Sequence, residues 1–176
     1  MEQFSYKKIW LIAYPILISL VMEQLIGLTD TAFMGRVGEI ELSASAIAGV
    51  YFLVIFMAGL GFSVGAQILM ARRNGEGNYS QIGGVFYQGL FFLLGLATLF
   101  FTLSQLFSDE ILSWMIASDK VREKAVDYID WRVYGFFFSF ACAMFRAFYV
   151  GTTQTKTLTL NSIVMVLSNV VFNLSL

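Results

Sequence analysis

The stretch that decides the fold is residues 9–34, which read IWLIAYPILISLVMEQLIGLTDTAFM. A helix needs about 20 mostly apolar residues to cross a hydrocarbon core about 30 Å thick, and this run is longer. It follows Lys7 and Lys8 but lacks a small-residue cleavage site, so it does not look like a cleaved signal peptide. We therefore predict that it forms a transmembrane helix.

Four more apolar runs follow, each bounded by charged or turn residues. They cover residues 42–70, 82–107, 121–150 and 158–176, and the run 121–150 becomes apolar at Val133. Hydrophobic residues make up 58% of the chain and charged residues 13%, about half the charged fraction of a typical soluble domain. The sequence predicts an all-α polytopic membrane protein with about five transmembrane helices.

The composition also excludes several classes of function. With a net charge of −1 and no lysine-rich stripe, the chain is predicted to bind no nucleic acid. It has no histidine and one cysteine, Cys142, which excludes a zinc site and a Ser/His or Cys/His nucleophile. An intramembrane aspartyl protease needs two aspartates that share a proton, and the apolar parts of the spans contain one. We predict a protein that is not an enzyme, with no catalytic residue and no cofactor.

Lysines and arginines near the span ends indicate orientation, because cytoplasmic loops carry more of them. One side has six and the other five, but the six lie tight against span ends whereas four of the five fall in one longer acidic connection, 108–132. We predict a cytoplasmic amino terminus. The six are Lys7, Lys8, Arg72, Arg73, Arg146 and Lys156, and the five are Arg36, Lys120, Arg122, Lys124 and Arg132.

The beginning of that acidic connection, residues 108–116, has two readings. Ser108, Asp109 and Glu110 suit the first turn of a helix. The segment is either a short amphipathic helix on the outer membrane surface, with Trp114 at the headgroup level, or an ordered loop packed on the helix ends.

Two carboxylates lie within the apolar parts of the spans, Glu23 and Asp30, two helical turns apart on nearly one face of the first span. An ionisable group in hydrocarbon is a functional-site hypothesis by default. Asp30 is predicted to lie in the outer half of the membrane, and the competing reading is a helix-end aspartate that reaches outer water. Glu23, beside Gln24, is better explained as a protonated, hydrogen-bonded packing residue.

Other positions allow both a structural and a functional role. Pro15 is expected to bend the first span, as a static kink or as a hinge. Asn169 and Asn173 are one turn apart and form either helix-to-helix contacts or half of a cation site with Asp30. Tyr128 and Arg132 line a vestibule or a solvated face. Glycines in the second and third spans are predicted to let helices approach closely, namely Gly49, Gly59, Gly61, Gly65, Gly84, Gly89 and Gly95.

Taken in order, these residues resemble the amino-terminal part of the MATE (multidrug and toxic compound extrusion) family over essentially the whole chain. Single positions are weak signals, and the ordered series is specific. The series is Pro15, Asp30, Gly35, Gly38, Leu42, Ala44, Gly61, Gly65, Gln67, Ala71, Arg72, Gly75, Glu76, Gly77, Tyr128, Arg132, Arg146, Gly151, Thr155, Lys156, Asn169 and Asn173.

The resemblance implies a twelve-helix transporter of two six-helix lobes, of which residues 1–176 would be an incomplete amino-terminal transmembrane lobe. Such a protein exports organic cations or other amphiphiles by alternating access, coupled to Na⁺ or H⁺. Its partners would be a small amphiphilic, cationic substrate, membrane lipid and the missing remainder of its own chain.

The resemblance also assigns roles to residues. Asp30 would be the cation-binding carboxylate, Asn169 and Asn173 its fifth-helix partners, Tyr128 a neighbour of the site and Pro15 the bending point. No metal is implied beyond a Na⁺ at Asp30. Some branches have an aspartate at the position of Asn173, so this chain has one carboxylate where those branches have two.

Two alternatives remain. A flippase of a related lipid or polysaccharide exporter family shares the helix count, but an anionic substrate calls for basic residues in the cavity, and none is evident within the apolar cores of the spans. The other alternative is a truncated membrane protein that does not transport, because five spans are fewer than the twelve that the resemblance implies.

Overall fold

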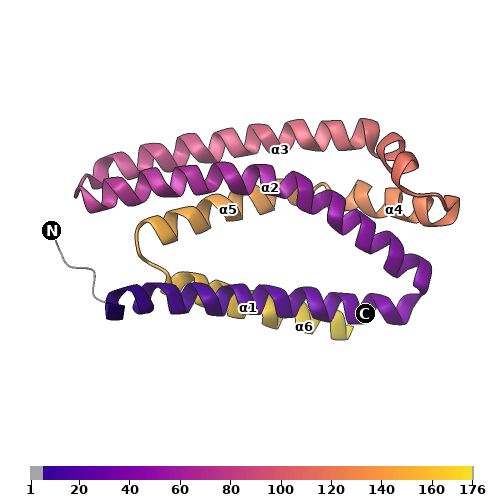
Figure 1. The fold of residues 1–176 in the computed structure, drawn as a ribbon, viewed down its shortest axis with the longest axis horizontal. Helices are drawn as coiled ribbons and strands as arrows, with labels where there is room; N and C mark the ends of the chain where they lie inside the picture. The colour runs from indigo at the N-terminus through magenta and orange to yellow at the C-terminus, as the bar shows by residue number, and fades with distance from the viewer. Residues whose placement is uncertain (1–5, 176) are drawn as a thin grey trace.

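The protein is described here by a computed structural model, which covers residues 6–175, with the side chains of residues 8 and 172–175 outside the description. Over this range the chain folds into helices and contains no strand. Figure 1 shows them in order as α1 (Tyr6–Val37), α2 (Glu39–Gly75), α3 (Tyr79–Met115), α4 (Asp119–Arg132), α5 (Gly135–Gly151) and α6 (Lys156–Ser175). The all-α class is thus confirmed.

Three helices are long and apolar enough to cross a membrane on their own. They are α1 from Ile9, α2 and α3, and the bent pair α4 and α5 makes a fourth span if it is counted as one. The apolar stretch of α6, Lys156–Val171, is shorter. The predicted boundaries 9–34, 42–70 and 82–107 fall inside α1, α2 and α3, while 121–150 covers most of α4 and α5 and 158–176 largely coincides with α6.

Both readings of residues 108–116 are wrong, because α3 continues without a break to Met115. Ser108 and Leu112 are buried, so this segment packs as the last turns of the long helix. The chain turns at Ile116, whose backbone is extended, and α4 begins three residues later. Arg122 of α4 lies 3.6 Å from the Asp109 carboxylate and 3.2 Å from Asp119.

The predicted fourth span is divided by a bend of 53° between α4 and α5. At the bend the Phe136 N–H donates to the Val133 carbonyl, three residues back, and the α-helical pattern is interrupted at Val133 and Tyr134, just before Gly135. Beyond it, α5 packs Phe136, Phe140 and Met144 into the core.

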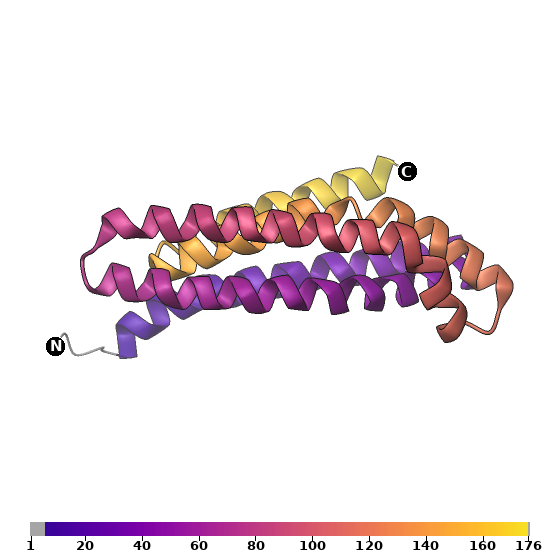
Figure 2. The same ribbon diagram turned by 90° about the horizontal axis from the view of Figure 1, so that it is seen from above.

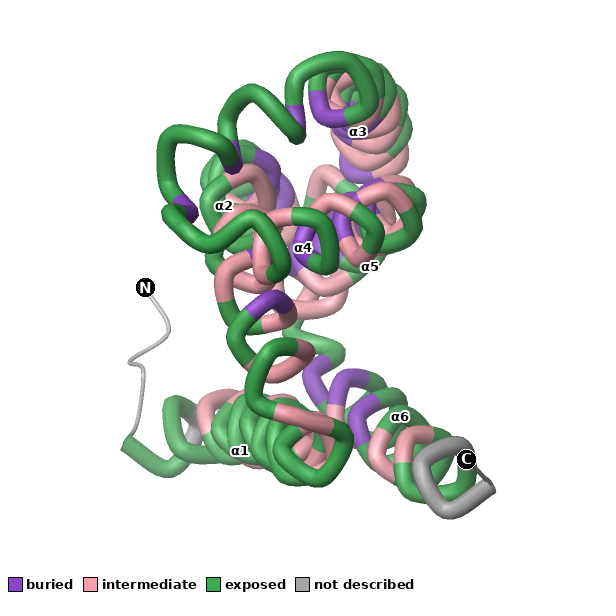
Figure 3. Tube along the Cα trace, turned by 90° about the vertical axis from the view of Figure 1, so that its right-hand side faces the viewer, coloured by how far each residue is buried: buried purple, intermediate pink, exposed green. Residues whose placement is uncertain are grey.

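The helices form two groups, seen end-on in Figure 3. In the first, α2, α3, α4 and α5 pack around the apolar core, whose largest buried members are Phe136, Phe140, Met70, Leu93, Leu112, Ile129 and Met144. In the second, α1 and α6 pack along each other, as Figures 1 and 2 show from two sides. The beginning of α2 joins the two groups, because it starts at the end of α1 and rises to α3.

Close approach through glycine is confirmed at two of the expected positions. A Cβ added to Gly59 would lie 2.5 Å from Phe140 Cε1, and one added to Gly89 would lie 2.6 Å from Met144 Cε. The other five have nothing within 4 Å, namely Gly49, Gly61, Gly65, Gly84 and Gly95. Gly59 and Gly89 therefore set the distance at which α5 packs on α2 and α3.

The turn between α2 and α3 carries a small ionic cluster outside the apolar parts of the helices. Arg72 Nε lies 2.9 Å and Arg73 Nη1 3.2 Å from the Glu76 carboxylate. The hydrogen bond from Arg72, helped by Arg73, holds the pKa of Glu76 below its ordinary value.

Candidate functional site

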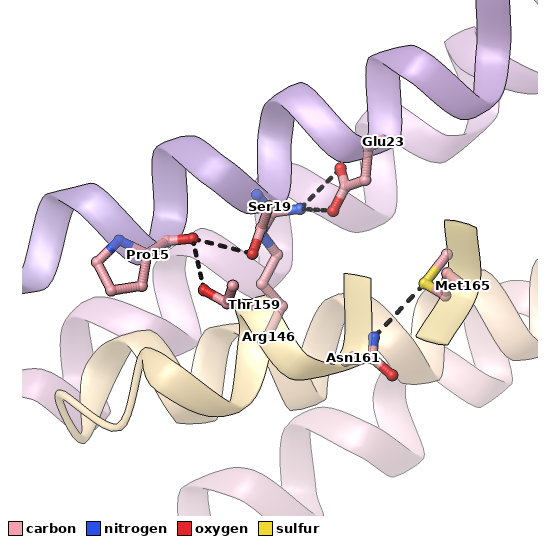
Figure 4. Close-up of polar contacts among 7 residues, drawn as sticks. All are labelled: Pro15, Ser19, Glu23, Arg146, Thr159, Asn161 and Met165. Carbon is pink, nitrogen blue, oxygen red and sulfur yellow. Dashed lines mark hydrogen bonds and ion pairs between the residues drawn. The ribbon is translucent and has the colours of Figure 1, made fainter. Parts of the chain in front are cut away.

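Residues of α1 form polar contacts with α6 and α5 at three levels along the helix. The first level is Pro15, through which α1 continues as one helix. Its carbonyl accepts a hydrogen bond from Ser19 Oγ at 3.0 Å and another from Thr159 Oγ1 of α6 at 3.1 Å, as Figure 4 shows. Pro15 therefore lies at a point where α1 is tied to α6, and its role as a hinge stays a prediction.

The second level is Glu23, which forms an ion pair with Arg146 of α5. Arg146 Nη1 lies 2.8 Å from Glu23 Oε1 and 3.1 Å from Oε2 (Figure 4). Both side chains are partly buried, Glu23 being 39% and Arg146 29% exposed. Glu23 is thus hydrogen-bonded, as expected, and its partner is a guanidinium that reaches it from another helix, which was not expected. That Glu23 is protonated stays a prediction.

The prediction that Arg146 lies at a span end, in a cytoplasmic loop, is wrong. It lies inside α5, five residues before the helix ends at Gly151. A basic residue is thus present within an apolar helix, whereas none was predicted in the apolar cores of the spans. The signal was available, since Arg146 falls within the run 121–150.

The third level is Asp30, the candidate cation-binding carboxylate. Its Oδ1 accepts a hydrogen bond of 2.8 Å from Asn169 Nδ2 of α6, so the structure brings these two residues together. Asp30 is exposed and Asn169 is half-buried. Asn173 lies in the last turn of α6, but its side chain is outside the described residues.

Tyr128 lies in a different environment from Asp30. Its hydroxyl accepts a 2.7 Å hydrogen bond from Arg132 Nη1, and the Arg132 guanidinium lies 4.9 Å from the centre of the Phe52 ring. Both residues line a cavity of about 510 Å³ that reaches Met34, one turn beyond Asp30. The cavity is lined by Met34, Glu41, Ala44, Ser45, Lys124, Asp127, Tyr128, Trp131 and Arg132.

Sequence reasoning missed two residues of this region besides the pairing of Arg146. Thr159 donates a hydrogen bond to the Pro15 carbonyl, and Ser19, which is 1% exposed, donates a second one to the same carbonyl. The only available signal was small hydroxyl residues in apolar runs, which commonly hydrogen-bond to their own helix, as Thr98 and Thr102 do here.

Comparison with known proteins identifies the family to which the chain belongs. A family model for MatE matches residues 15–174. A probable multidrug resistance protein NorM of Synechocystis is 27% identical over 94% of this chain and 36% of its own length, and one of Pasteurella multocida is 25% identical over 85% and 32%. No solved structure matches significantly.

The chain spans about a third of the length of these curated relatives. A NorM protein of Agrobacterium fabrum is 37% identical, over 43% of this chain. The matched region contains Pro15, Glu23, Asp30, Arg146 and Asn169, together with all or most of each helix described above. The chain is therefore a multi-pass membrane protein that belongs to the MatE family of transporters.

Proposed function

We propose that the chain is the amino-terminal part of an antiporter that exports drugs or other amphiphilic organic compounds by alternating access, coupled to Na⁺ or H⁺. The observation that carries this proposal is the hydrogen bond between Asp30 and Asn169 in a chain of the MatE family. The names of the relatives, probable multidrug resistance proteins, support export of drugs.

Asp30 is the group through which the ion acts. A carboxylate removed from water is stable when a cation is bound to it or when it is protonated. Either event changes what the carboxylate offers to Asn169, which donates to Asp30 in this structure. A change in this contact shifts the packing of α1 on α6, and a bend at Pro15 would pass that shift along α1.

A sodium ion and a proton place different demands on the site. Na⁺ requires several oxygen ligands, and besides the Asp30 carboxylate the amide oxygens of Asn169 and Asn173 are the candidates. A proton requires only the carboxylate. With one carboxylate in the site, the bound ion neutralises Asp30, so transport is predicted to respond to either a Na⁺ or a H⁺ gradient through this residue.

The transported compound is proposed to be a small amphiphilic cation that enters from the lipid-facing or cytoplasmic side. Arg146 does not favour the flippase alternative with its anionic lipid-linked substrate, because Glu23 already neutralises it. The amino terminus is proposed to be cytoplasmic, which places the α2–α3 turn and its two arginines on the same side.

The test is Asp30→Asn in the complete native gene product. We expect it to abolish ion-driven efflux of a lipophilic dye cation from cells while leaving expression unchanged, because an amide neither binds a proton nor supplies a charge. Asp109→Asn, an exposed carboxylate of α3, is the matched control and is expected to keep efflux. Efflux retained by Asp30→Asn would contradict the proposal.

The mass of the native gene product separates this function from the truncated alternative. A tag at the amino terminus reports it directly. We expect a product more than twice as heavy as the 19.7 kDa of these 176 residues. A product of 19.7 kDa would instead favour a protein that needs self-assembly to transport or that does not transport.

A further inference from the structure

The described polar contacts that α1 makes with other helices divide into those made with α6 and one made with α5. Towards α6, the Pro15 carbonyl accepts from Thr159 and the Asp30 carboxylate accepts from Asn169. Ser19 of α1 and Ser162 of α6 are both buried. With polar contacts near Pro15 and near Asp30, two points four turns apart, α1 and α6 are held as one unit.

Towards α5, α1 is linked by side chains where the two backbones stay apart. Among residues 6–175, no Cα of α1 comes within 8 Å of a Cα of α5. The Arg146 side chain nevertheless crosses this distance to reach Glu23 at 2.8 Å, as Figure 4 shows. The ion pair therefore joins the α1–α6 unit to the α2–α5 group at about the middle of α1.

The energetics of such a pair make it responsive to movement. Each charge is costly in hydrocarbon, and opposite charges in contact reduce that cost. Separating α1 from α5 leaves a guanidinium that needs water or another acceptor, and a carboxylate that needs a proton or a cation. The pair thus stabilises the arrangement in which α1 stands against α5, and it can be broken without disturbing the apolar core.

We propose that Glu23 and Arg146 are positioning residues, which fix where α1, and with it Asp30, stands relative to the α2–α5 group. We further propose that this ion pair opens when α1 and α6 move together during transport. Asp30 lies two turns along α1 from Glu23, so a displacement at Glu23 changes the surroundings of Asp30. This inference rests on the proposed function.

The first test measures position without measuring transport. Spin labels are attached at Leu28→Cys of α1 and Phe138→Cys of α5, both exposed, in the native gene product with Cys142→Ser, reconstituted in lipid vesicles. We expect Arg146→Gln to broaden or shift the distribution of label distances. Arg72→Gln, which breaks the surface pair with Glu76, is the control and is expected to leave it unchanged. An unchanged distribution in Arg146→Gln would overturn the inference.

The second test asks whether charge pairing matters for efflux. Glu23→Gln and Arg146→Gln are each expected to lower the efflux rate about tenfold or more, because each leaves one charge unpaired. The double variant Glu23→Arg/Arg146→Glu restores opposite charges at the same positions and is expected to regain much of the loss. If a single variant fails to accumulate in the membrane, the double variant decides. A double variant no better than the singles would overturn the proposed pairing role.

The outcomes separate this inference from the proposed function. If Asp30→Asn abolishes efflux while the variants of Glu23 and Arg146 keep it, the positioning role is wrong and the antiporter proposal stands. If Asp30→Asn keeps efflux, the antiporter proposal fails, and the label distances still show whether Arg146 positions α1.

Discussion

The two helix groups are held together in different ways. In the α2–α5 group the contacts are apolar and close, with Phe52 stacked on Phe136 at a ring-centre distance of 4.6 Å and Phe140 filling the space at Gly59. In the α1–α6 unit the described contacts include hydrogen bonds at Pro15 and Asp30. Only 6% of the residues in the apolar stretch of α1 are buried, against 17% in those of α2 and α3. Close apolar packing favours a single arrangement of helices, whereas hydrogen bonds and ion pairs can be exchanged for others.

The largest difference between the two groups is expected when a buried side chain of the core is shortened. We expect Phe140→Ala to lower the free energy of unfolding by about 3 kcal/mol, the lower end of the range for Phe→Ala in protein cores. The reason is that moving a side chain out of lipid into the protein stabilises less than moving it out of water. Leu28→Ala on the exposed face of α1 should change it by less than about 0.5 kcal/mol. Unfolding in mild detergent by added denaturant measures both, and equal losses would contradict the contrast between the groups.

A second test adds volume at the glycine contact. Gly59→Ala places a methyl group against the Phe140 ring, and we expect a loss of about 1–3 kcal/mol from overpacking. Gly61→Ala has open space around its Cβ and is expected to stabilise the helix by about 0.5–1 kcal/mol. Thermal unfolding of the two variants compares them directly, and a stable Gly59→Ala would show that α2 and α5 are not closely packed there.

A third test removes a tie within the α1–α6 unit. Thr159→Val deletes the hydrogen bond to the Pro15 carbonyl and should cost about 0.6 kcal/mol, the average for such bonds between membrane helices. Hydrogen exchange along α1 is expected to rise around Pro15. Thr98→Val, which loses a bond within α3 alone, is the control, and exchange in α1 that is the same in both variants would argue against the tie.

The smallest effect is expected at the α2–α3 turn. Because the pKa of Glu76 is lowered in the folded protein, its contribution to stability is present above the pKa of an unfolded glutamate and is lost as the pH falls through the folded value. Glu76→Gln should remove this small pH dependence and leave stability at acidic pH unchanged. Melting temperatures measured between neutral and acidic pH test this, and an identical pH dependence in the variant would contradict the assignment.

The sequence was sufficient to predict the long apolar helices and one polar contact. Runs of apolar residues require helices in a bilayer, and Asp30 with Asn169 follows from charge, spacing and the family resemblance. It was insufficient wherever the answer depended on how two helices face each other. The pairing of Arg146 with Glu23, 123 positions away, depends on how α1 and α5 face each other, and the contacts of Gly59 depend on the placement of Phe140. The continuation of α3 past Ser108 likewise depended on burial against neighbouring helices.

The Pro15 carbonyl accepts two hydrogen bonds, and this predicts how substitutions at positions 15 and 159 differ in effect. Pro15 has no backbone N–H to donate to the Leu11 carbonyl, whereas the carbonyl that accepts the hydrogen bond from Thr159 is present whatever residue stands at position 15. Substitutions at position 15 therefore alter the flexibility of α1 and keep the link to α6, whereas apolar substitutions at position 159 do the reverse. If every amino acid were tested at both positions, the set of tolerated residues would therefore differ between position 15 and position 159. A defect common to both sets of variants would indicate that the flexibility of α1 and its attachment to α6 serve the same step.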